Sequence, residues 1–317
     1  MKPYCYGVDL GGTTVKIGRF STGEAEPEKW EIPTRTEDGG SHILPDIAKA
    51  VLDNMKVNGI YHDMVEGIGI GVPGPVEDNG FVHGCANLGW GPMNAAGILS
   101  ELTGLPVRAA NDANAAALGE QRAGCGRNYQ SLVMITLGTG VGGGVVLNGE
   151  IVSGTNGAAG EIGHMQVVDP ADIVGHCGCG RVGCLEQAAS ATGLVNMTRK
   201  ILETSGKASC LRSVDELSAK AILDAARDGD PLAQEAAEKM MHYLALAASL
   251  IASVVDPDAF VIGGGVSRAG AYLIDGIARH YKKIVFHAHR ETPFIQAVLG
   301  NDAGMIGAAG LIWDGNK

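Results

Sequence analysis

Two segments of the chain repeat one pattern, in which a glycine-rich turn joins two short apolar runs. In the first segment, residues 4–20 are arranged around Asp-Leu-Gly-Gly-Thr at 9–13. In the second, the apolar run 132–136 precedes a glycine-rich stretch at 138–144, and the apolar run 145–147 follows it. This self-similarity favours a duplicated α/β architecture with one strand–turn–strand unit in each half. The alternative is that glycine-rich hairpins recur by chance.

The spacing of hydrophobic residues elsewhere in the chain predicts helices and buried strands in both halves. Helices are expected at 41–55, 93–102, 113–121, 231–255, 271–281 and 303–313, and further strands at 64–72, 107–110 and 259–262. The second half of 231–255 is rich in alanine, which predicts a helix buried on most sides. Because no linker rich in Pro or Ser separates the halves, we expect two lobes that share a hinge and a cleft.

Composition excludes several classes of protein. The formal net charge is −11, whereas a nucleic-acid-binding surface needs a basic patch, so no nucleic-acid partner is expected. The start of the sequence has no apolar signal core, and the longest apolar stretch, 244–255, is too short to span a bilayer. We therefore expect a cytoplasmic protein without a membrane partner. Glycine accounts for 48 of 317 residues, in clusters that are typical of phosphate-binding turns.

Three of the seven cysteines fall within eight residues. Cys177, Cys179 and Cys184 lie in His-Cys-Gly-Cys-Gly-Arg-Val-Gly-Cys-Leu-Glu, and His164 lies upstream in Gly-Glu-Ile-Gly-His. Three thiolates and an imidazole make a tetrahedral set for Zn²⁺, and a site with four protein ligands is structural because it has no open position. His176 is a rival ligand, but adjacent residues rarely reach one metal without strain. The alternative for the cluster is three reduced thiols without a metal.

Three glycine-rich turns, at 11–12, 138–144 and 263–265, each follow an expected strand. Backbone N–H groups in such turns can approach a phosphate chain. None has the P-loop or dinucleotide-binding spacing. Asp9 and Lys16 beside the first turn could supply a carboxylate for Mg²⁺ and a cation for a triphosphate. Taken singly, Asp9 would be a turn residue and Lys16 a solvated charge; the combination favours a nucleotide site.

Asn111 and Asp112 lie where an expected strand meets an expected helix. An Asp at such a junction usually caps the helix. A carboxylate at the edge of a cleft can also accept a proton from a substrate hydroxyl. The glycine-rich turns elsewhere in the chain favour the catalytic interpretation.

Taken in order, these motifs resemble the ROK family of sugar kinases and repressors. The resemblance rests on Asp-Leu-Gly-Gly-Thr (9–13), Val-Pro-Gly-Pro-Val (72–76), Asn-Leu-Gly-Trp (87–90), Asn-Asp-Ala-Asn-Ala-Ala-Ala-Leu-Gly-Glu (111–120), Leu-Gly-Thr-Gly-Val-Gly-Gly-Gly (137–144), Gly-Glu-Ile-Gly-His (160–164), Cys-Gly-Cys-Gly-Arg-Val-Gly-Cys-Leu-Glu (177–186), Ala-Ser-Ala-Thr-Gly (189–193) and Gly-Gly-Gly-Val (263–266). It implies a two-lobed actin- or hexokinase-like ATPase fold made of duplicated ribonuclease-H-like domains, with a cleft and a bound zinc. We expect a small domain at 1–115 plus 300–317 and a large domain at 116–299 that carries the zinc motif.

The resemblance also implies a role for individual residues. Asp112 would be the general base toward the sugar 6-hydroxyl. The expected sugar contacts are Asn87, Asn111, Asp112, Glu161, His164 and Glu186. The expected contacts to Mg-ATP are Asp9, Gly11, Gly12, Thr13, Lys16, Thr139, Gly140, Gly264 and Gly265. The expected ligands of a structural zinc are His164, Cys177, Cys179 and Cys184.

The expected activity is ATP-dependent phosphorylation of a hexose at its 6-hydroxyl, with D-glucose as the first candidate substrate. A kinase for N-acetylmannosamine or N-acetylglucosamine is the alternative within the same chemistry, because one sequence does not size the pocket around the sugar 2-position. A sugar-responsive repressor of the same family would carry an N-terminal helix-turn-helix domain, and the phosphate turn at residue 9 leaves no room for one. The family resemblance favours a homodimer or homotetramer.

Overall fold

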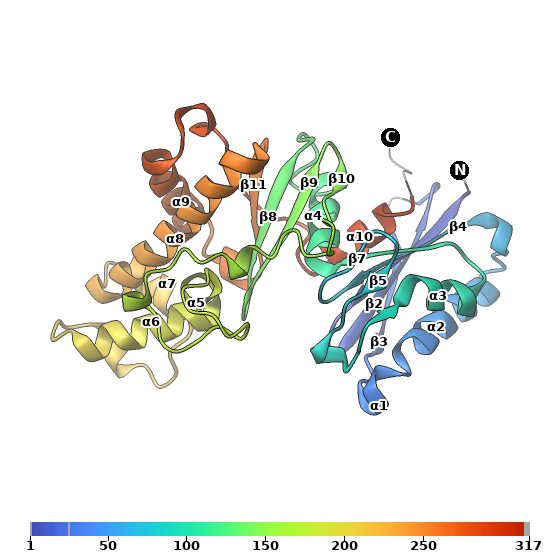
Figure 1. Ribbon diagram of the computed structural model, residues 1–317, viewed down its shortest axis with the longest axis horizontal. Coiled ribbons are helices and arrows are strands. Elements are labelled where there is room, and N and C mark those ends of the chain that lie inside the picture. Colours follow the sequence, from blue (N-terminus) through green and yellow to red (C-terminus); the bar gives the residue numbers. More distant parts are fainter. Residues whose placement is uncertain (1, 25, 314–317) are drawn as a thin grey trace. The chain divides into compact units, whose positions relative to one another are not determined.

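The computed structural model describes residues 2–24 and 26–313, which form two compact units (Figure 1). Unit 1 comprises the described residues of 1–130, 144–160 and 299–317, and unit 2 comprises 131–143 and 161–298. The chain therefore passes between the units four times. The domain boundaries expected from the sequence stay a prediction.

Each half of the chain builds a five-stranded sheet with the same strand pattern. The first sheet has the order β3-β2-β1-β4-β7 and the second the order β10-β9-β8-β11-β12. The first contains β1 (Tyr4–Leu10), β2 (Thr14–Ser21), β3 (Glu28–Pro33), β4 (Val65–Val72) and β7 (Val107–Asn111). The second contains β8 (Leu132–Leu137), β9 (Val141–Leu147), β10 (Glu150–Ile151), β11 (Ala259–Gly263) and β12 (Phe294–Gln296). In both, an antiparallel pair leads into parallel strands, which confirms the predicted duplication.

The faces of the first sheet differ because β4 alternates glycine with large apolar residues. Ile68, Ile70 and Val72 point to one face, where they join a core formed with α2 (Ile43–Val57) and α3 (Ala95–Thr103). The glycines between them point to the other face, where α4 (Asp112–Arg122) and α10 (Ala303–Gly310) pack. A Cβ at Gly69 would lie 1.6 Å from Ala308 O. Glycine at this position therefore lets a helix backbone touch the strand.

Helix α4 carries buried polar side chains that fix neighbouring segments of unit 1. Asn114 is 2% exposed, and its Oδ1 accepts a hydrogen bond from Val145 N–H at 3.1 Å. Glu120 is fully buried and accepts from Cys125 N–H and Leu299 N–H at 3.0 and 2.8 Å. Val145 and Leu299 both lie close to points where the chain re-enters unit 1, so α4 holds these segments in place.

In unit 2, α8 (Pro231–Val255) packs against α6 (Ala191–Thr204), α7 (Ala219–Arg227) and α9 (Ala271–Ile284) (Figure 1). It begins and ends where the sequence predicted. By length and composition alone, its 25 residues make it the one described helix long and apolar enough to cross a membrane, whereas the expectation considered only 244–255. Half of its most apolar window is buried inside the protein.

The smaller elements depart from the sequence-based expectation in places. The glycine-rich stretch 138–144 was expected to be a turn throughout, but β9 begins at Val141. Gly144 lies within this strand. A Cβ at this position would lie 2.6 Å from Ala113 O, so the glycine allows close packing against α4 and does not form a turn. Besides short 3-10 turns, the remaining short elements are α1 (Glu37–Gly40), β5 (Phe81–Val82), β6 (Met93–Asn94) and α5 (Glu186–Ala189).

Candidate functional site

A cluster of one histidine and three cysteines lies in unit 2. One ligand atom from each of His164, Cys177, Cys179 and Cys184 falls within 4.8 Å of all the others. The Sγ atoms of Cys179 and Cys184 are 3.6 Å apart, and Sγ of Cys177 is 3.5 Å from His164 Nδ1. Sulfur ligands placed tetrahedrally at about 2.3 Å from one Zn²⁺ would be about 3.8 Å apart. The geometry and the donor set therefore fit a zinc ion, and His176 is exposed and outside the group.

Electrostatics within the cluster favour thiolate at one cysteine. Arg181 Nε donates to Cys179 Sγ at 3.5 Å, and this contact holds the pKa of the Cys179 thiol at about 6. Burial raises the pKa of Cys184 to about 12. A cation among the sulfurs would favour deprotonation of all three, since metal ligation requires thiolates.

The imidazole of His164 faces two different neighbours. Its Nδ1 points toward the cysteines, while its Nε2 lies 3.8 Å from Glu161 Oε2. Glu161 is exposed and His164 is partly exposed. A metal bound at Nδ1 would fix the ring and leave a proton on Nε2, on the side where Glu161 lies.

Glu186, the first residue of α5, joins the cysteine cluster to the second glycine-rich turn. Its Oε2 accepts a hydrogen bond from Val141 N–H at 3.0 Å, and its Oε1 lies 3.8 Å from Cys177 Sγ. A Cβ at Gly140 would lie 2.3 Å from Glu186 Oε2. Gly140 thus leaves space for the carboxylate, which fixes the turn 138–140 beside the cluster.

The second and third glycine-rich turns are neighbours because β8 and β11 are parallel and end at the same edge of their sheet. Gly263 pairs with Thr136 in this register. Gly264, with φ of +81°, packs so closely that a Cβ would lie 2.4 Å from Leu137 O. Thr139 and Gly140 follow one strand, and Gly264 and Gly265 follow the other. The carboxyl edge of parallel strands is where α/β sheets generally bind ligands.

In unit 1, Asp9 and Lys16 lie directly opposite each other on β1 and β2. Burial raises the pKa of Asp9, and the nearby Lys16 opposes that shift. Lys16 Nζ donates to Asn301 O at 2.9 Å, just before α10. The turn that joins the strands carries Gly11, Gly12 and Thr13; Gly12 and Thr13 are exposed, and the turn closes through a Gly11 N–H bond to Thr14 O at 3.1 Å.

Asn111 and Asp112 end β7 and begin α4. Asn111 is the N-cap: its Oδ1 accepts from Ala113 N–H and Asn114 N–H, and its Nδ2 donates to Gly74 O at 3.0 Å. Asp112 is the first helical residue and its Oδ1 accepts from Ala113 N–H at 2.8 Å. The N-cap role considered for Asp112 therefore belongs to its neighbour.

Asn87 is exposed on a short helical turn, Ala86–Leu88, that follows Cys85. The nearby charge of Asp112 contributes to raising the pKa of Cys85, after burial as the main cause. Asn87, Asn111 and Asp112 therefore all belong to unit 1, whereas Glu161, His164 and Glu186 belong to unit 2.

Sequence reasoning missed two residues that shape the cluster. Gln187 Oε1 accepts from Gly183 N–H and Cys184 N–H at 2.9 and 3.2 Å, and Arg181 contacts Cys179 as described. Both residues lie inside or beside the cysteine motif, but only their side-chain direction reveals the role. A search for the polar residues that flank metal ligands would have singled them out.

Comparison with known proteins places these motifs in a family. A family described as "ROK family" matches residues 5–314. A glucokinase from Halalkalibacterium halodurans is 40% identical over 311 residues, covering 96% of this chain and 94% of the relative. An N-acetyl-D-glucosamine kinase from Yersinia pseudotuberculosis is 31% identical and covers 96% of this chain and 98% of the relative.

The fold is similar to that of a solved family member. A ROK family glucokinase from Streptomyces griseus, in complex with glucose and AMPPNP, has a TM-score of 0.73 and 34% identity and covers 98% of this chain and 99% of that chain. The chain therefore has the actin- or hexokinase-like α/β fold of such kinases, which confirms the expectation from the motifs.

Proposed function

We propose, from the premise that this chain belongs to the ROK family, that it is an ATP-dependent kinase that phosphorylates a hexose at the 6-hydroxyl, with D-glucose as the preferred substrate. The similarity to glucokinases over nearly the whole chain supports this proposal. The observation that carries the chemistry is the position of Asp112 at the start of α4, with Asn111 already serving as the cap. Asp112 is therefore not needed to begin the helix.

In this mechanism Asp112 accepts the proton of the sugar 6-hydroxyl as the oxygen attacks the γ-phosphoryl group. Phosphoryl transfer depends mainly on alignment and charge neutralisation, so the base needs a fixed position more than a strongly shifted pKa. The hydrogen bond from Ala113 N–H to Oδ1 holds the carboxylate in a fixed position at the start of α4.

Sugar binding would use groups that donate hydrogen bonds to hydroxyls and accept them from hydroxyls. We assign Asn87, Asn111, Glu161, His164 and Glu186 to this role. Carboxylates suit this task because each can accept hydrogen bonds from two sugar hydroxyls. Asn111 Oδ1 already accepts two backbone N–H bonds, so its contribution to the sugar would be a remaining amide N–H.

Nucleotide binding would use the glycine-rich turns. Gly11, Gly12, Thr13, Thr139 and Gly140 would present N–H and hydroxyl groups to the phosphates, and Gly264 and Gly265 would lie at the adenosine. Asp9 and Lys16 would supply a carboxylate toward Mg²⁺ and a cation. A bound Mg²⁺ would neutralise charge on the β- and γ-phosphate oxygens.

His164, Cys177, Cys179 and Cys184 would hold Zn²⁺ as a structural ion. With four protein ligands the ion has no position for a reacting water, so it would fix the loop rather than take part in phosphoryl transfer. Since His164 Nδ1 faces the cysteines, its Nε2 would donate to a sugar hydroxyl. The zinc cluster would in this way support sugar affinity.

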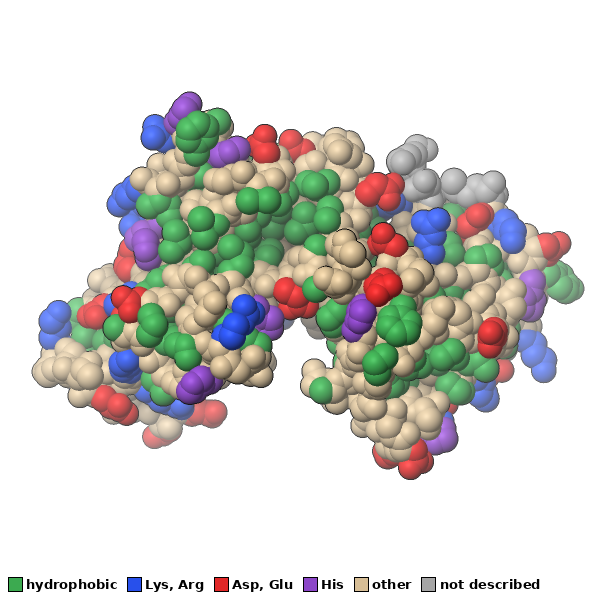
Figure 2. Space-filling view, viewed as in Figure 1, with side chains coloured by type: hydrophobic (Ala, Val, Ile, Leu, Met, Phe, Trp, Pro, Cys, Tyr) green, Lys and Arg blue, Asp and Glu red, His purple; other side chains and the backbone are tan. Residues whose placement is uncertain are grey.

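The second candidate is N-acetylglucosamine kinase activity, which the 31% identical relative favours. We also infer that the protein acts in the cytoplasm as a homodimer or homotetramer, without a nucleic-acid partner. On the face drawn in Figure 2, Lys and Arg side chains of the described residues are scattered among acidic ones. That distribution supports a small-molecule substrate rather than a nucleic acid.

The proposed base is tested by Asp112→Asn. The amide keeps the shape of the side chain and an oxygen for Ala113 N–H, but it cannot take the hydroxyl proton. We expect kcat for ADP release with glucose to fall by about 10²–10⁴-fold. Glucose affinity measured by calorimetry should change much less. Asp78→Asn, which alters an exposed carboxylate of unit 1, is the control. Normal turnover by Asp112→Asn would rule out this residue as the base.

A further inference from the structure

The loop 165–176 joins the histidine and the first cysteine of the metal cluster. Its first part is held beside Cys184, because Val167 N–H donates to Gly183 O at 2.9 Å and Leu185 N–H donates to Met165 O at 2.8 Å. A short ladder with the cysteine segment therefore fixes the chain just after His164. This ladder does not reach the end of the loop that carries Cys177.

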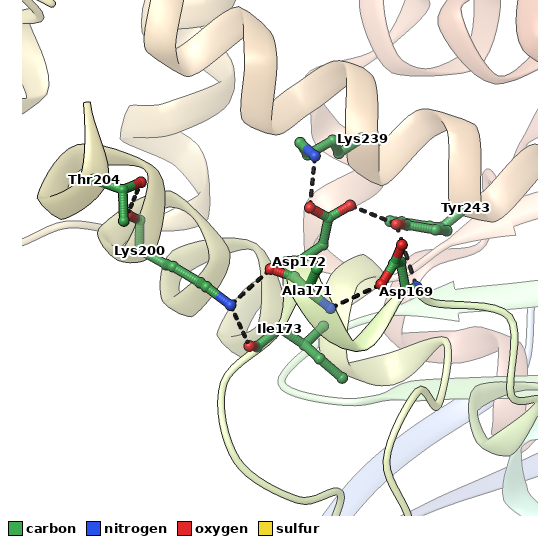
Figure 3. A network of polar contacts seen from close by, with 8 residues as sticks. All are labelled: Asp169, Ala171, Asp172, Ile173, Lys200, Thr204, Lys239 and Tyr243. Carbon is green, nitrogen blue, oxygen red and sulfur yellow. Dashed lines mark hydrogen bonds and ion pairs between the residues drawn. The ribbon is translucent and has the colours of Figure 1, made fainter. Parts of the chain in front are cut away.

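The middle of the loop is anchored on two helices of unit 2 (Figure 3). The carboxylate of Asp172 accepts from Lys239 Nζ at 2.6 Å and from Tyr243 OH at 2.5 Å, both on α8. Tyr243 OH in turn accepts from Asp169 N–H at 3.3 Å. From α6, Lys200 Nζ donates to the carbonyls of Ala171 and Ile173 at 2.7 and 3.0 Å. Two helices thus hold four of the five residues 169–173 of the loop.

Burial and charge make Asp172 the centre of this anchor. Its side chain is 20% exposed and that of Lys239 is 33% exposed, so solvent screens the pair only in part. Burial alone would raise the pKa of Asp172, but the hydrogen bonds from Lys239 and Tyr243 outweigh it and lower that pKa. Both carboxylate oxygens are occupied by donors from α8, so the network serves the loop rather than an outside ligand.

Beyond this anchor the chain reaches Cys177 through exposed residues. Val174 is 57% exposed, and Gly175 and His176 are exposed as well. Gln187 Nε2 donates a hydrogen bond to Gly175 O at 3.2 Å, a longer distance than those from Lys239 and Tyr243 to the Asp172 carboxylate. Asp172 is therefore the last loop side chain that these polar contacts anchor before Cys177, and the side chain of Ile173 next to it is buried.

We propose that Asp172 is a positioning residue of the metal site, which holds the loop 169–173 on α8 and so places Cys177 for the ion. This inference rests on the zinc-binding part of the proposed function. It predicts that the anchor controls how long the ion stays bound, although no atom of Asp172 is a ligand. Residues that support metal ligands in this way typically affect affinity by about 10–100-fold.

The test uses Asp172→Asn and Tyr243→Phe in the full chain loaded with zinc. Zinc release is followed by a chromogenic chelator such as 4-(2-pyridylazo)resorcinol. We expect the release rate to rise about tenfold for Asp172→Asn, at the low end of the range for such supporting residues. Tyr243→Phe should show a smaller rise in the same direction. Asp224→Asn is the control, because Asp224 is also a unit 2 carboxylate with two cationic partners, Lys220 and Arg227.

A second readout separates positioning from general loss of structure. KM for glucose should rise several-fold in Asp172→Asn, KM for ATP should stay within about twofold, and added zinc should restore the glucose value. If Asp172→Asn does not fold, the zinc release rate of Tyr243→Phe decides the question. This variant removes only the hydroxyl that donates to Asp172. Release at the wild-type rate in the folded variants would overturn this inference and leave the kinase proposal intact. A wild-type protein that binds no zinc would overturn the inference together with the zinc assignment.

Discussion

Glu186 illustrates how one side chain connects parts of the candidate site. Its carboxylate accepts from Val141 N–H, lies close to Cys177 Sγ, and occupies the space left by Gly140. The cysteine motif and the glycine-rich turn are both visible in the sequence, but 45 residues separate Glu186 from Val141. Spacing along the chain therefore identified the two motifs, while their contact depends on the fold of unit 2.

Individual roles at the start of α4 could be predicted only in part. The pair Asn111–Asp112 was recognised as a strand-to-helix junction, and either residue has the chemistry of an N-cap. The structure gives the cap to Asn111, which also donates to Gly74 O. Gly74 lies in a turn after β4, so the competition between these two residues was decided by a tertiary contact.

At residue scale, Asp230 gives a prediction for pH dependence. It caps α8 by accepting from Leu232 N–H and Ala233 N–H, and it also accepts from Cys210 N–H at 2.7 Å. Although burial opposes the shift, these bonds lower the pKa of Asp230 from 3.8 to about 2. Asp230→Ala should lower the free energy of unfolding at pH 7 by about 1 kcal/mol, as for other N-caps.

The direction in which pH changes the contribution of Asp230 to stability follows from its pKa, which is lower in the folded than in the unfolded protein. The contribution of Asp230 is fully present above pH 3.8 and is lost as the pH falls through about 2. The difference between wild type and Asp230→Ala in urea unfolding should therefore shrink between pH 4 and pH 2, with Asp228→Ala as an exposed control. If the difference in unfolding free energy between wild type and Asp230→Ala stayed constant over this range, the charge of the Asp230 carboxylate would not contribute to stability.

At the scale of elements, the alternation of β4 determines which helices pack on which face. The apolar run was readily predicted as a strand, whereas the role of its glycines required knowledge of α4 and α10, which come from distant parts of the chain. The edge strand β3 and helices α6 and α7 were not predicted. In β3, four of the six residues, including Glu28 and Lys29, are exposed, so the apolar signal was weak.

The close approach of α10 to β4 predicts a large effect of Gly69→Ala. The added Cβ would lie 1.6 Å from Ala308 O, which belongs to the backbone and cannot turn aside. We expect the free energy of unfolding to fall by about 3 kcal/mol, at the upper end for overpacking. Urea denaturation would measure this loss. Gly23→Ala is the control in the same unit, because a Cβ there meets nothing within 4 Å. Equal stability of both variants would show that α10 can move away at little cost.

For the whole molecule, duplication is the feature that the sequence revealed most clearly. Two glycine-rich turns at matching places in the pattern predicted two related halves, and the two sheets have equivalent strand orders. The path of the chain was harder to predict, since segments 144–160 and 299–313 both return to unit 1. Such returns depend on buried contacts, as between Glu120 and Leu299, that no local pattern encodes.

The central claim is that this ROK family member transfers phosphate from ATP to the 6-hydroxyl of glucose. Its most direct test is kcat/KM for ADP release with D-glucose, D-mannose, N-acetylglucosamine, N-acetylmannosamine and 6-deoxyglucose. We predict the highest value for glucose and no turnover of 6-deoxyglucose, which lacks the accepting hydroxyl. A higher kcat/KM for an N-acetyl sugar than for glucose would identify the protein as a kinase of N-acetyl hexosamines. Turnover of none of these sugars, or equal turnover of 6-deoxyglucose, would contradict the claim.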